Sequence, residues 1–187
     1  MKKIILASQS PRRKQLLEWA EIPFDVMVSD ADESFSNELT IKNVPVFIAK
    51  QKALAIKNKL ANNSCAILAA DTVVVFNNTI IGKPNNKNEA IKILSLLSGK
   101  IHTVITGVVI LKEEKEITFS DITEVEFHTL TQEQIEFYVE KYKPYDKAGA
   151  YAIQEWIGVV GIKQIKGDFY NVMGLPISRV VQTLQQL

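Results

Sequence analysis

The sequence has little cysteine and little histidine, which limits the sites that it could build. Its single cysteine, Cys65, excludes an internal disulfide and is interpreted as a small packing residue rather than a nucleophile. Its two histidines are His102 and His128, and it contains no CxxC, HExxH or paired-histidine motif. A zinc site of the usual kind is therefore not expected.

Long apolar runs and an excess of one charge are also missing. Lysine and arginine number 22 against 21 aspartates and glutamates, a formal net charge of +1, which argues against a general nucleic-acid or membrane-binding surface. No segment approaches transmembrane length, and the first apolar run is too short for a signal peptide. We therefore expect a cytoplasmic protein with neither a membrane nor a nucleic acid as partner.

The pattern of apolar residues indicates an α/β protein. The 187 residues are 47% hydrophobic, enough for the core of one domain, with or without two lobes. Strands alternating with helices, together with one long hairpin, predict a mixed sheet. The predicted strands are 4–7, 24–28, 66–76 (interrupted at 71–72), 79–81, 101–111 and 117–127. The predicted helices are one that starts after residue 10, one over about 45–60, one over 89–97, one over about 131–142 and one that starts at 176.

The turn at 8–13, Ser-Gln-Ser-Pro-Arg-Arg, has the pattern of an anion site. A short apolar strand leads to Ser10, a typical helix N-cap, and to Pro11 at the first helical position. Free backbone N–H groups and the positive end of the helix dipole meet there, and Arg12 and Arg13 add two cations. Phosphate is the natural candidate for the anion. The alternative is a capped surface helix with two solvated arginines.

Asp71 is the strongest candidate for chemistry. It interrupts an apolar run and precedes Thr72 and three valines, where an aspartate is costly unless it is paired, hydrogen-bonded or bound to a metal. A carboxylate at the end of a buried strand is a common metal ligand or general base. The alternative is an aspartate that caps a neighbouring turn.

Three further segments could complete a nucleotide site. The acidic loop at 30–33 could bind Mg²⁺, Lys83 is held extended by Pro84, and the amide of Gln154 suits the edge of a base. Each also has an ordinary alternative, namely a solvated loop, a surface lysine and a surface amide. Together with the arginines and Asp71, they fit hydrolysis of a nucleotide phosphate bond.

The chain closely resembles the Maf family of nucleotide pyrophosphatases, nearly from end to end. Several separate motifs in the right order make this resemblance far more specific than any one of them. In chain order they are LAS-x-SPRR at 6–13, DE at 32–33, AKQKA at 49–53, DTVV at 71–74, GKP at 82–84, LSG at 97–99 with His102, TGV at 106–108, DKAGAY at 146–151, IQ at 153–154 and NVMGLP at 171–176.

The resemblance implies a fold, a reaction and partners. The implied fold is α/β, a mixed twisted sheet flanked by helices of the Maf/ITPase type, in a single domain over 1–187 that allows two lobes around a central cleft. The implied reaction is hydrolysis of nucleoside triphosphates to the monophosphate and diphosphate with a divalent cation, Mg²⁺ or Mn²⁺. The DTVV and GAYxIQ forms resemble the branch that acts on dTTP and UTP. A homodimer is also expected.

The resemblance also implies roles for individual residues. Asp71 is the proton acceptor, and Glu33, Lys52 and Lys83 match further active-site positions. Our hypothesis for the mechanism is that Asp71 binds the metal, activates water or does both, and that Glu33 helps to hold the metal. Arg12, Thr72 and Gln154 influence specificity. The residues expected to bind substrate are Ser8, Ser10, Arg12, Arg13, Lys52, Thr72, Lys83 and Gln154.

Two points bear on this interpretation. The chain departs from the family pattern at 155–158, Glu-Trp-Ile-Gly, where many relatives have small residues after the glutamine, and this affects the expected shape of the base pocket. The alternative function, from a different class, is a nucleotide-binding regulator of septum formation with little turnover. That protein would use the same triphosphate site without a catalytic metal.

Overall fold

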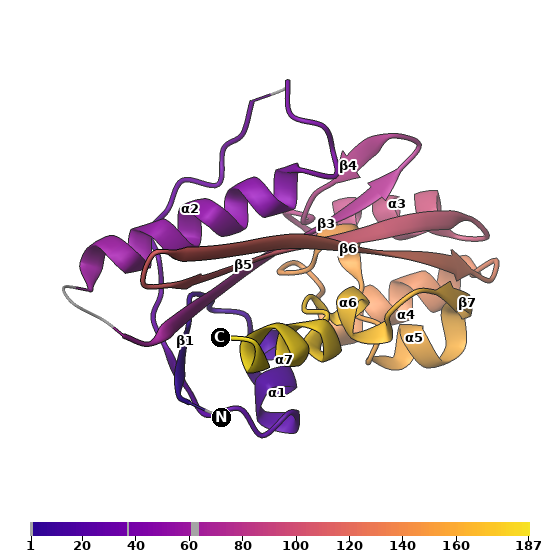
Figure 1. The fold of residues 1–187 in the computed structure, drawn as a ribbon. Helices are drawn as coiled ribbons and strands as arrows, with labels where there is room; N and C mark the ends of the chain where they lie inside the picture. Colours follow the sequence, from indigo (N-terminus) through magenta and orange to yellow (C-terminus); the bar gives the residue numbers. More distant parts are fainter. Residues whose placement is uncertain (1, 37, 61–63) are drawn as a thin grey trace. The chain divides into compact units, whose positions relative to one another are not determined.

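The computed structural model describes residues 2–36, 38–60 and 64–187, which form a mixed α/β fold with a seven-stranded sheet (Figure 1). The strands are β1 (Ile4–Leu6), β2 (Phe24–Val26), β3 (Ala66–Phe76), β4 (Thr79–Ile81), β5 (Ile101–Lys112), β6 (Lys115–Phe127) and β7 (Ile162–Lys166). Their order is β2-β1-β3-β5-β6-β7, with β4 paired to β3. β1 runs parallel to β2 and β3, whereas the β3–β4 and β6–β7 pairs are antiparallel. The predicted mixed sheet is confirmed.

The chain divides into two compact units, and the first contains both termini. It comprises Met1–Thr72, Thr106–Asp121 and Gly174–Leu187. Its helices are α1 (Pro11–Trp19), α2 (Val44–Lys59) and α7 (Ile177–Gln185). Within this unit α2 lies on one face of β1, β3 and β5, while α1 and α7 lie on the other (Figure 1).

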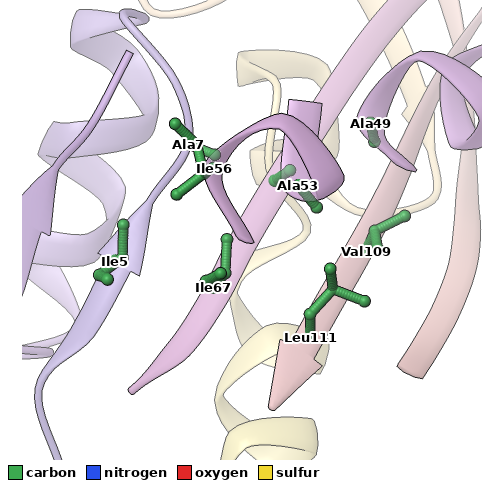
Figure 2. Packing of buried hydrophobic residues seen from close by; sticks show 9 residues of the cluster. Ile5, Ala7, Ala49, Ala53, Ile56, Ile67, Val109 and Leu111 are labelled. Carbon is green, nitrogen blue, oxygen red and sulfur yellow. The ribbon is translucent and has the colours of Figure 1, made fainter. Parts of the chain in front are cut away.

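Small apolar residues let α2 pack closely on the sheet. Figure 2 shows Ala49, Ala53 and Ile56 of α2 against side chains from β1, β3 and β5. Burying each of the larger side chains contributes about 1.5–3 kcal/mol. The strand residues of this cluster are Ile5, Ile67, Ala69, Val109 and Leu111, and Ala7 directly follows β1. All lie at odd positions, so the odd residues of these strands face α2.

The second unit comprises Val73–Ile105 and Ile122–Met173. It holds the helices α3 (Lys87–Leu97), α4 (Gln132–Tyr142), α5 (Trp156–Gly161) and α6 (Phe169–Met173), together with the 3₁₀ turn η1 (Ala148–Ala150). α3 and α4 pack against each other. In the part of the chain that the structure describes, none of the helices combines the length and the apolar character needed to cross a membrane.

Capping side chains mark the starts of α1 and α4, as the sequence predicts. Ser10 Oγ accepts a hydrogen bond from the backbone N–H of Arg13 at 3.5 Å, and Pro11 opens α1. At α4 the Thr131 hydroxyl and the Gln134 side chain cap each other's backbone N–H groups, at 3.3 and 2.9 Å. These bonds satisfy N–H groups that have no partner inside the helix.

One expectation about the sheet is corrected. The predicted interruption at 71–72 is wrong, because β3 runs unbroken from Ala66 to Phe76. Between about residue 142 and residue 176, where the sequence predicts neither helix nor strand, the structure has η1, α5, β7 and α6. These elements are between 3 and 6 residues long, too short for apolar periodicity to reveal them.

Buried His102 should make the stability of the second unit depend on pH. Its side chain is 2% exposed, and its Nε2 lies 2.7 Å from the Tyr151 hydroxyl. Burial lowers the pKa of His102 from its ordinary value of 6.5 to about 4. Between these two values the unfolded chain binds more protons than the folded chain, so the free energy of unfolding falls as pH falls. The expected loss at pH 4 is about 3 kcal/mol.

Urea unfolding between pH 7 and pH 4 tests this expectation. His102→Gln removes the titrating group, so the stability advantage of the wild type over this variant should shrink as the pH is lowered. His128→Gln is the matched control, because His128 is exposed. Parallel pH profiles for the wild type and His102→Gln would contradict the expectation.

Candidate active site

One lysine joins the two carboxylates that the sequence predicts as metal ligands. Lys52 lies on α2, and its Nζ is 2.7 Å from Glu33 Oε1 and 2.8 Å from Asp71 Oδ1. The side chains of Lys52 and Asp71 are 12% and 15% exposed, whereas that of Glu33 is 55% exposed. The cluster therefore has a shielded ion pair on the inside and a carboxylate in contact with solvent on the outside.

The alternation of β3 explains why Asp71 meets α2. Ile67 and Ala69 point toward α2 in the core, and Asp71 is the next residue on that face. Lys52 precedes Ala53, which packs in the same core. An isolated charge at this position would be costly, and the ammonium group of Lys52 compensates for it.

Thr72 points to the opposite face of the sheet, where it meets Arg13. Arg13 Nη2 donates to Thr72 Oγ1 at 3.0 Å, Nη1 donates to Ser8 Oγ at 3.1 Å, and Nε donates to the Gly174 carbonyl at 2.8 Å. The hydroxyls of Thr72 and Thr106 are 2.9 Å apart. These hydrogen bonds form a second, hydroxyl-rich cluster around Arg13, which Thr72 joins from the residue next to Asp71.

Arg13 is a buried cation held in one position. Its three side-chain nitrogens all donate to protein oxygens, and the residue is only 8% exposed. Burial lowers the pKa of Arg13, and the negative charge of Asp71 acts in the opposite direction. A guanidinium stays protonated even so. The alternative of two solvated arginines is therefore wrong for Arg13, while Arg12 is half-buried in the first turn of α1.

Two predicted site residues belong to the second unit. Lys83 and Gln154 are both exposed. Lys83 follows β4, and the neighbouring Gly82 carbonyl accepts a hydrogen bond from Gly149 N at 3.2 Å, which places this loop beside η1. Gln154 comes shortly before α5. The other predicted residues, Ser8, Ser10, Arg12, Arg13, Glu33, Lys52, Asp71 and Thr72, all belong to the first unit.

Thr106 and Gly174 are part of the Arg13 cluster and were not predicted as site residues. Thr106 is fully buried inside the apolar run of β5. A polar residue in such a run is the same signal that identified Asp71, and it could have found Thr106. Gly174 contributes only a backbone carbonyl, for which the side-chain pattern gives no signal.

Two carboxylates of the Asp71 cluster are groups that could hold a divalent cation. Within the described ranges, no group of three or more His, Cys, Asp or Glu residues could hold a metal. Glu33 and Asp71 nevertheless bring two carboxylates to one cation, the Lys52 ammonium. Mg²⁺ is commonly bound by one or two carboxylates and completes its shell with phosphate oxygens and water.

Comparisons with known proteins agree along the whole chain. A family model described as "Maf-like protein" matches residues 3–187. A dTTP/UTP pyrophosphatase of Cytophaga hutchinsonii is 49% identical over 98% of this chain and 84% of its own length. Proteins of the same name from Parabacteroides distasonis and Bacillus cereus are 46% and 48% identical over 98% and 100% of this chain, and over 95% and 96% of their own lengths.

A solved structure, that of the Staphylococcus aureus Ham1 protein, is a more distant match. It is 15% identical, with a TM-score of 0.42 over 67% of this chain and 72% of that one.

Proposed function

The chain belongs to the Maf family, and from this premise we propose that it is a nucleotide pyrophosphatase that hydrolyses dTTP and UTP to the monophosphate and diphosphate. The observation that carries the proposal is the meeting of Lys52, Glu33 and Asp71. It is supported by relatives 46–49% identical that are named dTTP/UTP pyrophosphatase. The proposed role is removal of canonical or modified pyrimidine nucleotides from the nucleotide pool.

The proposed reaction is attack of water on the α-phosphorus. A new P–O bond forms, the bond to the β-phosphate oxygen breaks, and diphosphate leaves. Asp71 accepts the proton of the attacking water, and Lys52 holds its carboxylate in place. Mg²⁺ or Mn²⁺, held by Glu33 and Asp71, would supply positive charge to the phosphates.

Cations and hydroxyl groups of the chain stabilise the triphosphate. Lys52, Arg12 and Lys83 neutralise phosphate charge, the main requirement of phosphoryl chemistry. Arg13 contributes a fixed positive charge, since its nitrogens already donate to protein oxygens. Ser8, Ser10 and the backbone N–H groups at the start of α1 complete the proposed phosphate site.

Specificity is proposed to rest on Thr72, Gln154 and Arg12. The Thr72 hydroxyl is bound to Arg13 and lies beside Thr106, so its orientation is fixed before any nucleotide binds. The amide of Gln154 offers both a donor and an acceptor to a pyrimidine edge.

We further propose that residues 1–187 form a single Maf-type domain that contains both units. A homodimer and a cytoplasmic location follow from the sequence interpretation and the family resemblance.

Product analysis tests the proposed reaction. The protein, dTTP and Mg²⁺ are incubated in ¹⁸O-labelled water, and the products are examined by mass spectrometry. Attack at the α-phosphorus places the label in dTMP and leaves the diphosphate unlabelled. Label in diphosphate, or release of orthophosphate, would contradict the proposed reaction.

A further inference from the structure

The segment that carries Gln154 is anchored on both sides by one side chain, that of Tyr138. Two residues before Gln154, the backbone N–H of Ala152 donates to the Tyr138 hydroxyl at 3.1 Å. One residue after it, the Glu155 carboxylate accepts a hydrogen bond from the same hydroxyl. Tyr138 lies on α4 and is fully buried, so this phenol bridges the residues around Gln154 from a rigid position.

Lys147 holds the Glu155 carboxylate from a second direction. Its Nζ lies 3.6 Å from Glu155 Oε1 and 2.7 Å from Asp146 Oδ1. The side chains of Lys147 and Glu155 are only 10% and 22% exposed. Water and salt screen such a shielded pair less than a surface pair, so it holds its geometry more firmly.

The backbone around Gln154 has little room to move. A Cβ atom on Gly158 would lie 1.7 Å from the Ile153 carbonyl oxygen, so α5 packs directly on the segment through this glycine. Tyr151, at the start of the segment, is tied to His102 through its hydroxyl at 2.7 Å. Gln154 is itself exposed. An exposed amide therefore projects from a backbone anchored on either side.

We infer that Glu155 and Tyr138 are positioning residues that hold the backbone at Gln154, and with it the point from which the Gln154 amide reaches the base. The inference rests on the proposed function. Uracil and thymine present an N–H donor beside carbonyl acceptors, whereas cytosine presents an amino donor beside a nitrogen acceptor. An amide that reaches the base from a fixed backbone meets one of these patterns better than the other, whereas an amide on a mobile backbone can shift to satisfy both.

The test compares nucleotide selectivity in matched variants. We expect Glu155→Ala to lower the ratio of kcat/KM for UTP over CTP by about tenfold, the size expected for loss of one hydrogen bond to a charged group, through KM and with little change in kcat. Glu155→Gln keeps an acceptor for Tyr138 and should recover most of the selectivity. Gln154→Ala removes the amide itself and therefore shows the largest loss of UTP/CTP selectivity that the positioning variants can reach. Adding Tyr138→Phe to Glu155→Ala should lower selectivity further, because it also removes the acceptor of the Ala152 N–H.

Glu140→Ala is the control for charge and stability. Glu140 lies on α4 like Tyr138, but it pairs with Lys87 on the surface, so its loss should leave the UTP/CTP ratio unchanged. Melting temperatures of all variants show whether loss of folding accounts for any change. A merely structural role for Glu155 would lower activity on UTP and CTP equally.

The outcomes separate the inference from the proposed function. An unchanged UTP/CTP ratio in Glu155→Ala, in an enzyme that hydrolyses UTP, overturns the inference and leaves the proposed function intact. An absence of turnover in the wild type overturns the proposed function. In that case calorimetry measures the dissociation constants of UTP and CTP in the wild type and in Glu155→Ala. An unchanged ratio of these two constants in Glu155→Ala overturns the inference. If neither nucleotide binds, the inference and the proposed function are both overturned.

Discussion

Asp71→Asn should lower kcat for dTTP and UTP by about a thousandfold and leave the fold unchanged. The amide has nearly the volume of the carboxylate, but it cannot accept a proton from water. Lys52 keeps Glu33 as a partner in this variant, so its ammonium group is not left buried without a counter-charge. Nucleotide binding should therefore persist while turnover is lost.

The measurement is diphosphate release under saturating nucleotide, together with calorimetric binding of dTTP. Asp25→Asn is the matched control, since Asp25 also lies on a strand and pairs with a lysine, Lys3 at 2.7 Å, but both side chains are exposed. The control should keep wild-type kcat. Wild-type kcat in Asp71→Asn would remove Asp71 from the reaction.

Gly107→Ala should destabilise the protein by about 3 kcal/mol or more, the upper range for overpacking. A Cβ atom at this position of β5 would lie 2.2 Å from Val46 N and 2.3 Å from the carbonyl carbon of Pro45. Both atoms are backbone, so no change of rotamer relieves the clash. The start of α2 would have to move off the sheet, and α2 carries Lys52 to Asp71.

Urea unfolding at neutral pH measures this effect. Gly82→Ala is the matched control, because among the described atoms none lies within 4 Å of a Cβ built at Gly82. The control should unfold at nearly the wild-type urea concentration. Similar midpoints for Gly107→Ala and the wild type would show that α2 does not rest on β5 in this way.

Much of the fold could be predicted because its main elements have strong local signals. Alternating apolar residues mark β3, and capping residues mark the starts of α1 and α4. The continuity of β3 through Asp71 could not be predicted in this way. It depends on Lys52, 19 residues away in the chain, which compensates for the carboxylate inside the strand.

The candidate site was only partly predictable for a related reason. The residue types identified Asp71 and Arg13 as site residues. They did not indicate to which face of the sheet the Asp71 side chain points, or what the Arg13 side chain contacts. The burial of Arg13 depends on Gly174, 161 residues further along the chain, whose carbonyl accepts its Nε–H. The pairing of Tyr138 with Glu155 likewise joins α4 to a segment with no helical or strand pattern of its own. Such contacts arise from tertiary structure, which local patterns do not report.

The two candidate functions, nucleotide pyrophosphatase and nucleotide-binding regulator, differ in whether the nucleotide is hydrolysed. A pyrophosphatase and a nucleotide-binding regulator would both bind a triphosphate, but only the enzyme needs Asp71 and Glu33 for catalysis. A regulator would bind its nucleotide and release it unchanged.

Diphosphate release from a panel of nucleoside triphosphates, with Mg²⁺ and with the metal chelated, tests the central claim most directly. We expect rapid metal-dependent release from dTTP and UTP, slower release from CTP and from the purine nucleotides, and none from Asp71→Asn. Binding of dTTP or UTP with no diphosphate released in the presence of Mg²⁺ would contradict the account and favour the regulator.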